Sequence, residues 1–263
     1  MKKNIFVLTS LMLTLGCGCD SFLDETNYSD VTSEGGYYDT EAGLNAVVNA
    51  CYTPLRFWAG KEDAIGLSET GTDIIAAGSG CVDNNMAAYT QSLDGTNSAC
   101  TFYFDRFYAA INWCNTAIFH AQTVPNPSND EILATTLNKR DSDERVLRTF
   151  YYWILTETFG DTYYTDQPST SIVMNPVKTS TDNIYQYMFD DLDWAIKSKL
   201  STLQNDGGRV TIWTAKALKA RLLLTRASEK NDVDMYGQAY DLAKDVIENG
   251  PFELAEDFAS IWD

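Results

Sequence analysis

Residues 143–161 read DERVLRTFYYWILTETFGD. Its apolar side chains recur at the three- and four-residue spacing of one helix face: Val146, Leu147, Phe150, Tyr151, Ile154 and, at the edge, Thr158. Asp141 with Glu144 three residues later is typical of a helix start, and Gly160 of a helix end. The pattern predicts an aromatic-rich helix over 143–159 that packs its apolar side against other elements.

The same spacing recurs through most of the chain. It predicts helices after Thr40, over 103–122, from Thr181 onward, over 213–226 and over 235–249, and a weaker one over 128–138. The last two strong ones form a pair of tetratricopeptide size, with small residues that allow close approach. No alternating strand pattern of useful length is present. We therefore expect a mostly α fold of tetratricopeptide-like helical hairpins joined by long irregular loops.

Two polar features of these helices carry expectations of their own. Asn115 lies in the apolar stripe of the 103–122 helix, so it should hydrogen-bond to a buried partner. Asp190, Asp191 and Asp193 lie away from the apolar stripe of their helix, which predicts a solvated acidic face.

The N-terminus has the composition of an export signal. A short basic start, Met1-Lys2-Lys3, precedes an apolar run over 5–15 and the small residues Gly16-Cys17-Gly18-Cys19. Such a run is too short to span a bilayer as a helix. We expect a signal peptide over 1–18, an acylated cysteine at Cys19, with Cys17 as the alternative, and a polar tether over 19–36.

The other four cysteines fall into two pairs with different expectations. Cys81 and Cys100 lie in one loop-like segment and are the pair expected to form a disulfide outside the cytoplasm. Cys51 and Cys114 lie on predicted helices and read equally well as small buried apolar residues. No C-x-x-C spacing occurs, which argues against zinc and thioredoxin-type redox sites. No metal or cofactor site is predicted.

Charge and motifs exclude several classes of function. The chain of 263 residues carries 37 acidic and 19 basic side chains, a formal net charge of -18, which argues against a nucleic-acid partner. G-x-S-x-G, H-E-x-x-H and P-loop motifs are absent, and the single histidine, His120, is expected in a capping or surface role. Carboxylates are numerous enough for a glycosidase pair, but any acidic protein offers such pairs. No enzymatic activity is predicted.

Five segments together resemble the SusD/RagB family of surface glycan-binding lipoproteins. They are CDSFLD (19–24), FYAAINWCNTA (107–117), DERVLRTFYYWILTETFGD (143–161), the helix over 184–195 and the segment from Gly208-Arg209-Val210 to Ala220-Arg221. Val146 and Thr149 depart from the usual Phe and Ala of the third. Family members continue well beyond a segment like 252–263, so the resemblance implies an N-terminal part of a longer protein, with an incomplete SusD-like helical domain over 37–263.

The resemblance implies a binding function without catalysis. Such lipoproteins are attached to the outer membrane of Bacteroidetes-type bacteria by their lipid alone and face the exterior. They pass oligosaccharides, or in some members peptides, to a TonB-dependent transporter of the SusC type. A helical scaffold that binds a peptide or protein partner is the rival hypothesis, since helical hairpins commonly bind partner segments.

One glycine-rich segment, 56–101, is the predicted binding surface. It breaks the helical periodicity and combines aromatic rings with short polar side chains, which suit the apolar faces and hydroxyls of sugars. The predicted ligand contacts are Trp58, Asp73, Tyr89, Asn97 and Tyr103. The structural alternatives are that Trp58 covers the first helix and that Asp73 and Asn97 stabilise turns.

Overall fold

The structure is a computed structural model that describes residues 38, 40–59, 62–76, 78, 84–123, 131–198 and 208–261. At 41, 59, 62–64, 123, 131–140 and 261 it describes the backbone only. The predicted signal peptide over 1–18, the tether over 19–36, Cys17, Cys19 and Cys81 lie outside these residues. Acylation and the Cys81–Cys100 disulfide therefore stay predictions.

The described residues are mostly helical, which confirms the predicted fold class. The helices are α2 (Glu41–Tyr52), α3 (Leu55–Ala59), α4 (Glu62–Ser68), α5 (Asn84–Ala88), α6 (Ser98–Thr123), α7 (Glu131–Phe159), α8 (Thr181–Lys197), α9 (Ile212–Lys230) and α10 (Val233–Asn249), with a 3-10 turn at Ala259–Ile261. Two short strands, β1 (Thr162–Tyr163) and β2 (Lys178–Thr179), pair antiparallel between α7 and α8. The segment predicted as irregular, 56–101, contains the short helices α3, α4 and α5.

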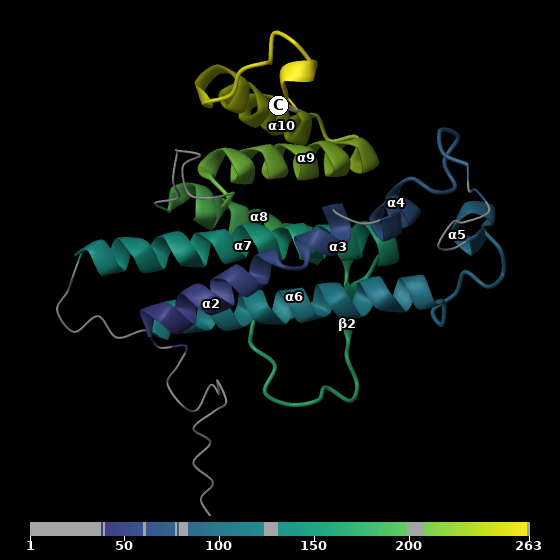
Figure 1. Ribbon diagram of the computed structural model, residues 1–263, viewed down its shortest axis with the longest axis horizontal. Coiled ribbons are helices and arrows are strands. Elements are labelled where there is room, and N and C mark those ends of the chain that lie inside the picture. The colour runs from purple at the N-terminus through teal and green to yellow at the C-terminus, as the bar shows by residue number, and fades with distance from the viewer. Residues whose placement is uncertain are drawn as a thin grey trace, which may run out of the picture. The chain divides into compact units, whose positions relative to one another are not determined.

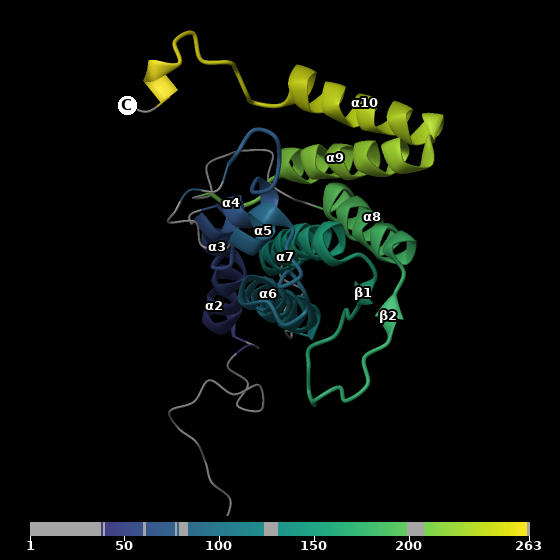
Figure 2. The same ribbon diagram turned by 90° about the vertical axis from the view of Figure 1, so that its right-hand side faces the viewer.

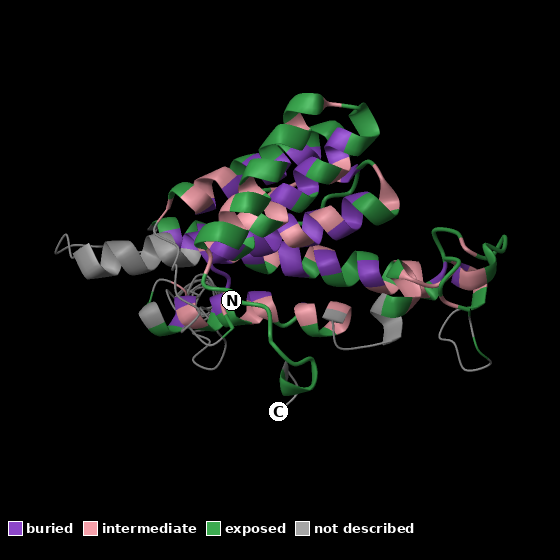
Figure 3. Ribbon diagram, turned by 90° about the horizontal axis from the view of Figure 1, so that it is seen from above, coloured by how far each residue is buried: buried purple, intermediate pink, exposed green. Residues whose placement is uncertain are grey.

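The long helices stack in chain order. α6 packs on α7, α7 on α8, α8 on α9 and α9 on α10, while α2 lies against both α6 and α7 (Figures 1 and 2). The core lies between α2, α6, α7 and α8 and includes the fully buried rings of Phe107, Tyr151, Tyr152 and Tyr185. Figure 3 colours the buried positions of the helices purple. Consecutive packing of helices is how hairpin repeats bury apolar faces that a single helix leaves exposed.

Several helix ends follow the chemistry that the sequence suggested. Thr40 caps α2 by accepting from the backbone N–H of Gly43 at 3.1 Å. Gly160, with φ of 69°, ends α7 as predicted. Asn231, in the left-handed region, ends α9, and Asp232 at once caps α10 by accepting from the N–H of Met235 at 3.0 Å. Two residues thus make the turn of the α9–α10 hairpin.

The start of α7 differs from the prediction. Instead of beginning after Asp141, the helix starts at Glu131, so the predicted helices over 128–138 and 143–159 are one element. The residues from Asp141 to Glu144 therefore lie inside the helix, and all four are buried. They do not cap it, because their backbone N–H groups are within the helix rather than at its free end.

Asp191 of α8 belongs to a buried ionic network, whereas Asp190 on the same helix is exposed as predicted and Asp193 is half-buried. Asp191 is buried and accepts from Arg145 at 2.7 Å and from two guanidinium nitrogens of Arg148 at 2.8 and 2.7 Å. Arg148 also donates to Oδ1 of Asn115 at 2.7 Å, and Asp141 accepts from Arg145. The prediction was wrong for Asp191 because its partners come from α7 and no spacing within α8 indicates them.

Asn115 has the buried partners that its position required. Its amide nitrogen donates to the backbone oxygens of Thr165 and Gln167, both at 3.1 Å, in the loop between β1 and β2. His120 lies in the last turn of α6 and is buried, with its ring near those of Tyr38 and Phe119, so the predicted surface role is wrong and the capping role stays a prediction. Cys51 and Cys114 are buried free thiols, consistent with small apolar core residues.

Candidate functional site

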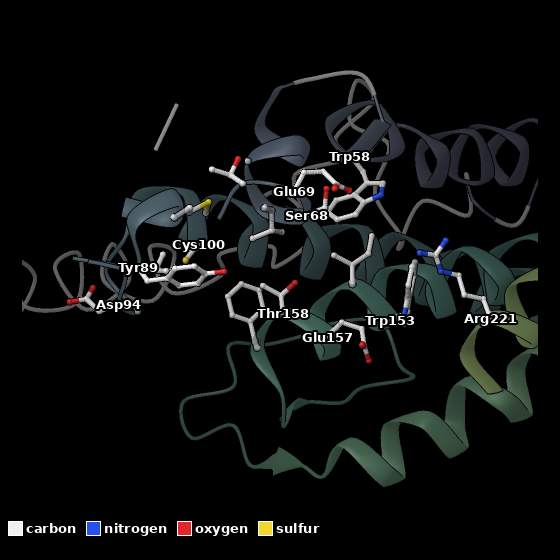
Figure 4. Close-up of a pocket in the computed structure, with 18 residues that line it drawn as sticks. Trp58, Ser68, Glu69, Tyr89, Asp94, Cys100, Trp153, Glu157, Thr158 and Arg221 are labelled. Atoms are coloured by element: carbon white, nitrogen blue, oxygen red, sulfur yellow. The ribbon is translucent and has the colours of Figure 1, made fainter. Parts of the chain in front are cut away.

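An open cleft of about 900 Å³ lies between the short helices of segment 56–101 and the C-terminal half of α7. The short helices and their turns contribute Trp58, Ser68, Glu69, Thr70 and Tyr89, and α7 contributes Trp153, Glu157, Thr158 and Phe159, with Arg221 from α9. In Figure 4, Tyr89 and Asp94 lie at one end of the cleft and Trp153 and Arg221 at the other. The volume is within the range of sites that hold small molecules.

Tyr89 is held in a conformation that exposes its ring. Its φ is 48°, which few non-glycine residues adopt, and its side chain is 70% exposed. The ring packs on Gly71, where an added Cβ would lie 3.0 Å from the ring and 2.9 Å from the backbone oxygen of Met86. Gly71 itself has φ of 91°, so glycine is needed there both for conformation and for space. The turn after α4 thus packs against the ring of Tyr89 and helps to fix its position.

Trp153 and Arg221 form the other end of the cleft. The Arg221 guanidinium lies 4.9 Å from the Trp153 ring centre, a cation–π geometry. The indole N–H of Trp153 is buried and has no hydrogen-bond partner among the described residues. Between the two ends, Trp58 is half-buried and meets Phe107 of the core edge-on, at 6.1 Å between ring centres.

Three carboxylates line the cleft, and two of them have identified partners. Asp94 accepts from the hydroxyl and the backbone N–H of Thr96, at 2.7 and 2.8 Å, and these bonds hold its pKa below the usual value. Glu157 accepts from the hydroxyl of Tyr185 at 2.5 Å. Burial, followed by this hydrogen bond, raises the pKa of Tyr185, so the tyrosine stays a donor. The third carboxylate, Glu69, is half-buried in the turn after α4.

The structure brings two of the five predicted contact residues to the cleft, Trp58 and Tyr89. Asp73 is exposed in the turn after α4, and is not among the lining residues. Asn97 caps α6, because its side-chain oxygen accepts from the N–H groups of Ala99 and Cys100 at 2.9 and 3.3 Å. Tyr103 is buried in the core beside Phe107. Ligand contact by the five residues stays a prediction.

Sequence reasoning missed the α7 and α9 side of the cleft. Trp153, Phe159 and Arg221 lie far along the chain from segment 56–101, and single-chain spacing does not show that these parts meet. One signal was present: the run 150–153 carries four consecutive rings, Phe-Tyr-Tyr-Trp, more than one core-facing stripe of a helix can bury. At least one of them had to face outward.

The described ranges contain no group of three or more His, Cys, Asp or Glu side chains that could hold a metal ion. Every helix there is too short or too polar to cross a lipid bilayer.

Comparison with known proteins places the chain beside SusD-like proteins. No family model matches it. A SusD-like protein of Bacteroides ovatus is 24% identical over 277 aligned positions, which cover 100% of this chain and 47% of that protein. The chain therefore spans about half the length of the curated relative that it matches.

Solved structures share the fold. A SusD homologue from Bacteroides thetaiotaomicron superposes with a TM-score of 0.72 at 20% identity, over 88% of this chain and 45% of that one. A surface glycan-binding protein A from Bacteroides fluxus gives a TM-score of 0.64 at 19% identity, over 85% of this chain and 47% of that one. The chain is thus similar along its whole length to a SusD-like protein and shares the fold of a SusD homologue.

Proposed function

We propose that this chain binds oligosaccharides in the cleft and does not cleave them. The observation that carries the proposal is the side-chain content of the cleft: the rings of Trp58 and Tyr89 lie beside hydroxyl and carboxylate groups. Sugar rings present apolar C–H faces that pack on aromatic rings, and hydroxyls that need hydrogen-bonding partners. The name of the Bacteroides fluxus neighbour, a surface glycan-binding protein, supports the same class of ligand.

The cellular setting is part of the proposal. Residues 1–18 are a signal peptide, 19–36 a tether acylated at Cys19, and 37–263 a helical binding domain that faces the cell exterior from the outer membrane. A SusC-like TonB-dependent transporter receives the ligand. Mass spectrometry of the protein made in a Bacteroides host should find an acylated peptide that begins at Cys19. An unmodified Cys19, or an uncut signal, would contradict the anchoring.

A matched set of variants tests whether the cleft binds sugar. The full chain is titrated calorimetrically with malto-, laminari-, xylo- and manno-oligosaccharides of six units. Tyr89→Ala should weaken the binding of the recognised sugar by about 2- to 10-fold, since an aromatic contact contributes roughly 0.5–1.5 kcal/mol beyond its buried area. Tyr240→Ala is the control, because Tyr240 on α10 is 64% exposed and lies outside the cleft lining.

A second test compares two tryptophan variants. Trp58→Ala should weaken binding, and Trp58 should contribute to a change of intrinsic fluorescence when sugar is added. Trp113→Ala is its control, since Trp113 lies on α6, is 37% exposed and does not line the cleft. Equal affinities of wild type, Tyr89→Ala and Trp58→Ala would place the site elsewhere.

The states of two cleft carboxylates support the proposal that the chain does not cleave the sugar. A glycosidase needs one carboxyl group that stays protonated near neutral pH, whereas hydrogen bonds from Thr96 hold the pKa of Asp94 low. Glu157 is committed to Tyr185. Incubation of the chain with the recognised oligosaccharide should produce no new reducing ends, and their appearance would contradict the proposal.

Peptide binding is the second candidate. The observation that favours it is the carboxylate content of the cleft, Glu69, Asp94 and Glu157 against the single guanidinium of Arg221, which suits a basic peptide. It predicts that a lysine-rich peptide binds in a salt-dependent way and that none of the four oligosaccharide series binds.

A further inference from the structure

A second pocket continues the cleft beyond Phe159. It has a volume of about 420 Å³ and shares Gly95, Cys100 and Phe159 with the cleft. Its other walls come from the first turns of α6 and from the β1–β2 hairpin, through Thr101, Phe104, Asp161, Thr162, Tyr163, Pro176 and Lys178. Since a wall of one cavity is also a wall of the other, the two are adjacent parts of one surface.

An exposed ring lies in the second pocket next to the shared wall. Phe104 is 39% exposed, and Phe159 meets it edge-on at 5.4 Å between ring centres. On its other side Phe104 contacts Tyr108, at 4.7 Å. Two neighbours thus fix the position of Phe104 while part of its ring stays open. This is the same kind of surface that Tyr89 presents in the cleft.

The hairpin wall of the second pocket is held in place by hydrogen bonds to α6 and to the start of α8. The Tyr108 hydroxyl lies 2.5 Å from Oγ1 of Thr162 and donates to the backbone oxygen of Tyr163 at 2.6 Å. Asp161 accepts from the N–H and the hydroxyl of Thr181, at 2.8 and 3.0 Å. A pre-formed wall reduces the ordering cost of binding. Lys178 is exposed there and can donate to sugar hydroxyls. The exposed Thr101 hydroxyl donates to the backbone oxygen of Asn97 at 3.0 Å and can accept from a sugar hydroxyl.

We propose that the cleft and the second pocket together bind one linear oligosaccharide longer than a disaccharide, with Phe104 as a stacking contact for its distal units. The inference rests on the proposed function and adds the length class of the ligand to it. Neither Phe104 nor the β1–β2 hairpin was among the ligand contacts expected from the sequence.

Affinity as a function of ligand length tests the inference. The full chain is titrated calorimetrically with malto-, laminari-, xylo- and manno-oligosaccharides of two to six units. In the series that binds, affinity should rise about tenfold or more from two to six units, since each added stacking contact contributes roughly a factor of 2 to 10. Phe104→Ala should remove most of that gain and leave the disaccharide affinity within about twofold.

A bulky substitution supplies an independent variant. Thr101→Trp fills the second pocket from an exposed position and should abolish the length dependence without disturbing the core. Ala109→Trp is the matched control, because Ala109 is exposed on the same helix and lines neither pocket. Thermal unfolding of all three variants shows that each is folded.

The outcomes separate this inference from the proposed function. If disaccharide and hexasaccharide bind equally, or if Phe104→Ala and Thr101→Trp weaken both to the same extent, the sugar site stands and the two-pocket inference is overturned. If no oligosaccharide of any length binds, both are overturned. A length gain that Phe104→Ala and Thr101→Trp remove and Ala109→Trp keeps supports the inference.

Discussion

Glu144 is an ionisable residue whose side chain is shielded from solvent. Its side chain is fully buried in the middle of α7, and neither carboxyl oxygen has a hydrogen-bond partner among the described residues. Burial, and next the neighbouring Asp143, raise its pKa well above the usual value, with Cys114 and Asp141 adding to the shift. A carboxyl group in such a site stays protonated because leaving an unpaired charge there costs more than keeping the proton.

We predict that Glu144→Gln changes how stability depends on pH. The pKa is raised in the folded protein, so on raising the pH the unfolded chain loses this proton first, near its ordinary value of about 4.3. Above that pH the wild type loses unfolding free energy, by up to ~1.4 kcal/mol per pH unit, until the folded group also ionises. Glutamine cannot titrate, so the variant should lack this loss and be more stable than wild type at pH 7, by about 1–3 kcal/mol.

Chemical denaturation from pH 4 to pH 8 measures the effect. The difference between variant and wild type isolates Glu144 from Asp141, whose pKa burial also raises. Glu248→Gln on the exposed face of α10 is the control, and should stay within about 0.5 kcal/mol of wild type at every pH. Parallel pH profiles for wild type and Glu144→Gln would show that Glu144 is ionised or solvated in the folded protein.

At the scale of elements, α7 shows what local pattern can and cannot predict. The apolar stripe from Val146 to Ile154 predicted a helix, and Gly160 its end, because both signals are local. The helix start was predicted wrongly, since Asp141–Glu144 resemble a cap in sequence. Their partners are distant: Arg209 reaches Asp143 at 3.4 Å, and Asp191 of α8 binds Arg145 of this helix. A cap and a buried polar run differ only in such tertiary contacts.

Side chains of α6 and α7 hold the β1–β2 hairpin in place. Asn115 and Tyr152 bind the backbone of Thr165, and Asn112 accepts from the N–H of Ser169 at 2.7 Å. Beyond these anchors the apolar side chains of Ile172, Met174 and Val177 are exposed. The hairpin therefore keeps its place through polar contacts at its base rather than through burial of its tip.

We predict that Asn115→Ala loosens this hairpin. The change leaves the buried guanidinium of Arg148 and the backbone oxygens of Thr165 and Gln167 without their amide partner, which should cost about 1–3 kcal/mol. Hydrogen exchange over residues 162–180 should accelerate more than in α9. Asn112→Ala is the comparison, because its contact with Ser169 is exposed and water can replace it. Equal exchange in the two variants would contradict an anchoring role for Asn115.

At the scale of the whole molecule, the candidate site joins parts that the sequence keeps apart. Segment 56–101 was predictable as an interruption of the helical pattern, because glycine and turn residues lie there, and it forms one wall of the cleft. Its partner wall was not, since Trp153 and Arg221 come together only through the packing of α7 on α9. Asn97 and Tyr103 show the converse: residue type suggested ligand contact, while helix capping and core packing use them. Which polar or aromatic residues are exposed is decided by tertiary structure.

Charge is the property of the whole chain that bears on ligand choice. The formal net charge is -18, and Glu69, Asp94 and Glu157 line the cleft against one guanidinium. A negative potential repels anionic ligands, and salt screens it, with a Debye length of about 10 Å at 0.1 M. We predict that the chain discriminates against anionic glycans, and that this discrimination depends on ionic strength.

Calorimetry with a neutral hexasaccharide that binds and with hexagalacturonate, at about 20 mM and 500 mM NaCl, tests the prediction. The anionic sugar should bind more weakly at low salt, and the gap should narrow at high salt while the neutral affinity stays constant. Glu69→Gln removes a cleft charge and should improve hexagalacturonate binding at low salt, whereas Glu248→Gln, the same change far from the cleft lining, should have a smaller effect. Tighter binding of hexagalacturonate at low salt would mean that Arg221 and Lys178, rather than the carboxylates, set the potential that a ligand meets.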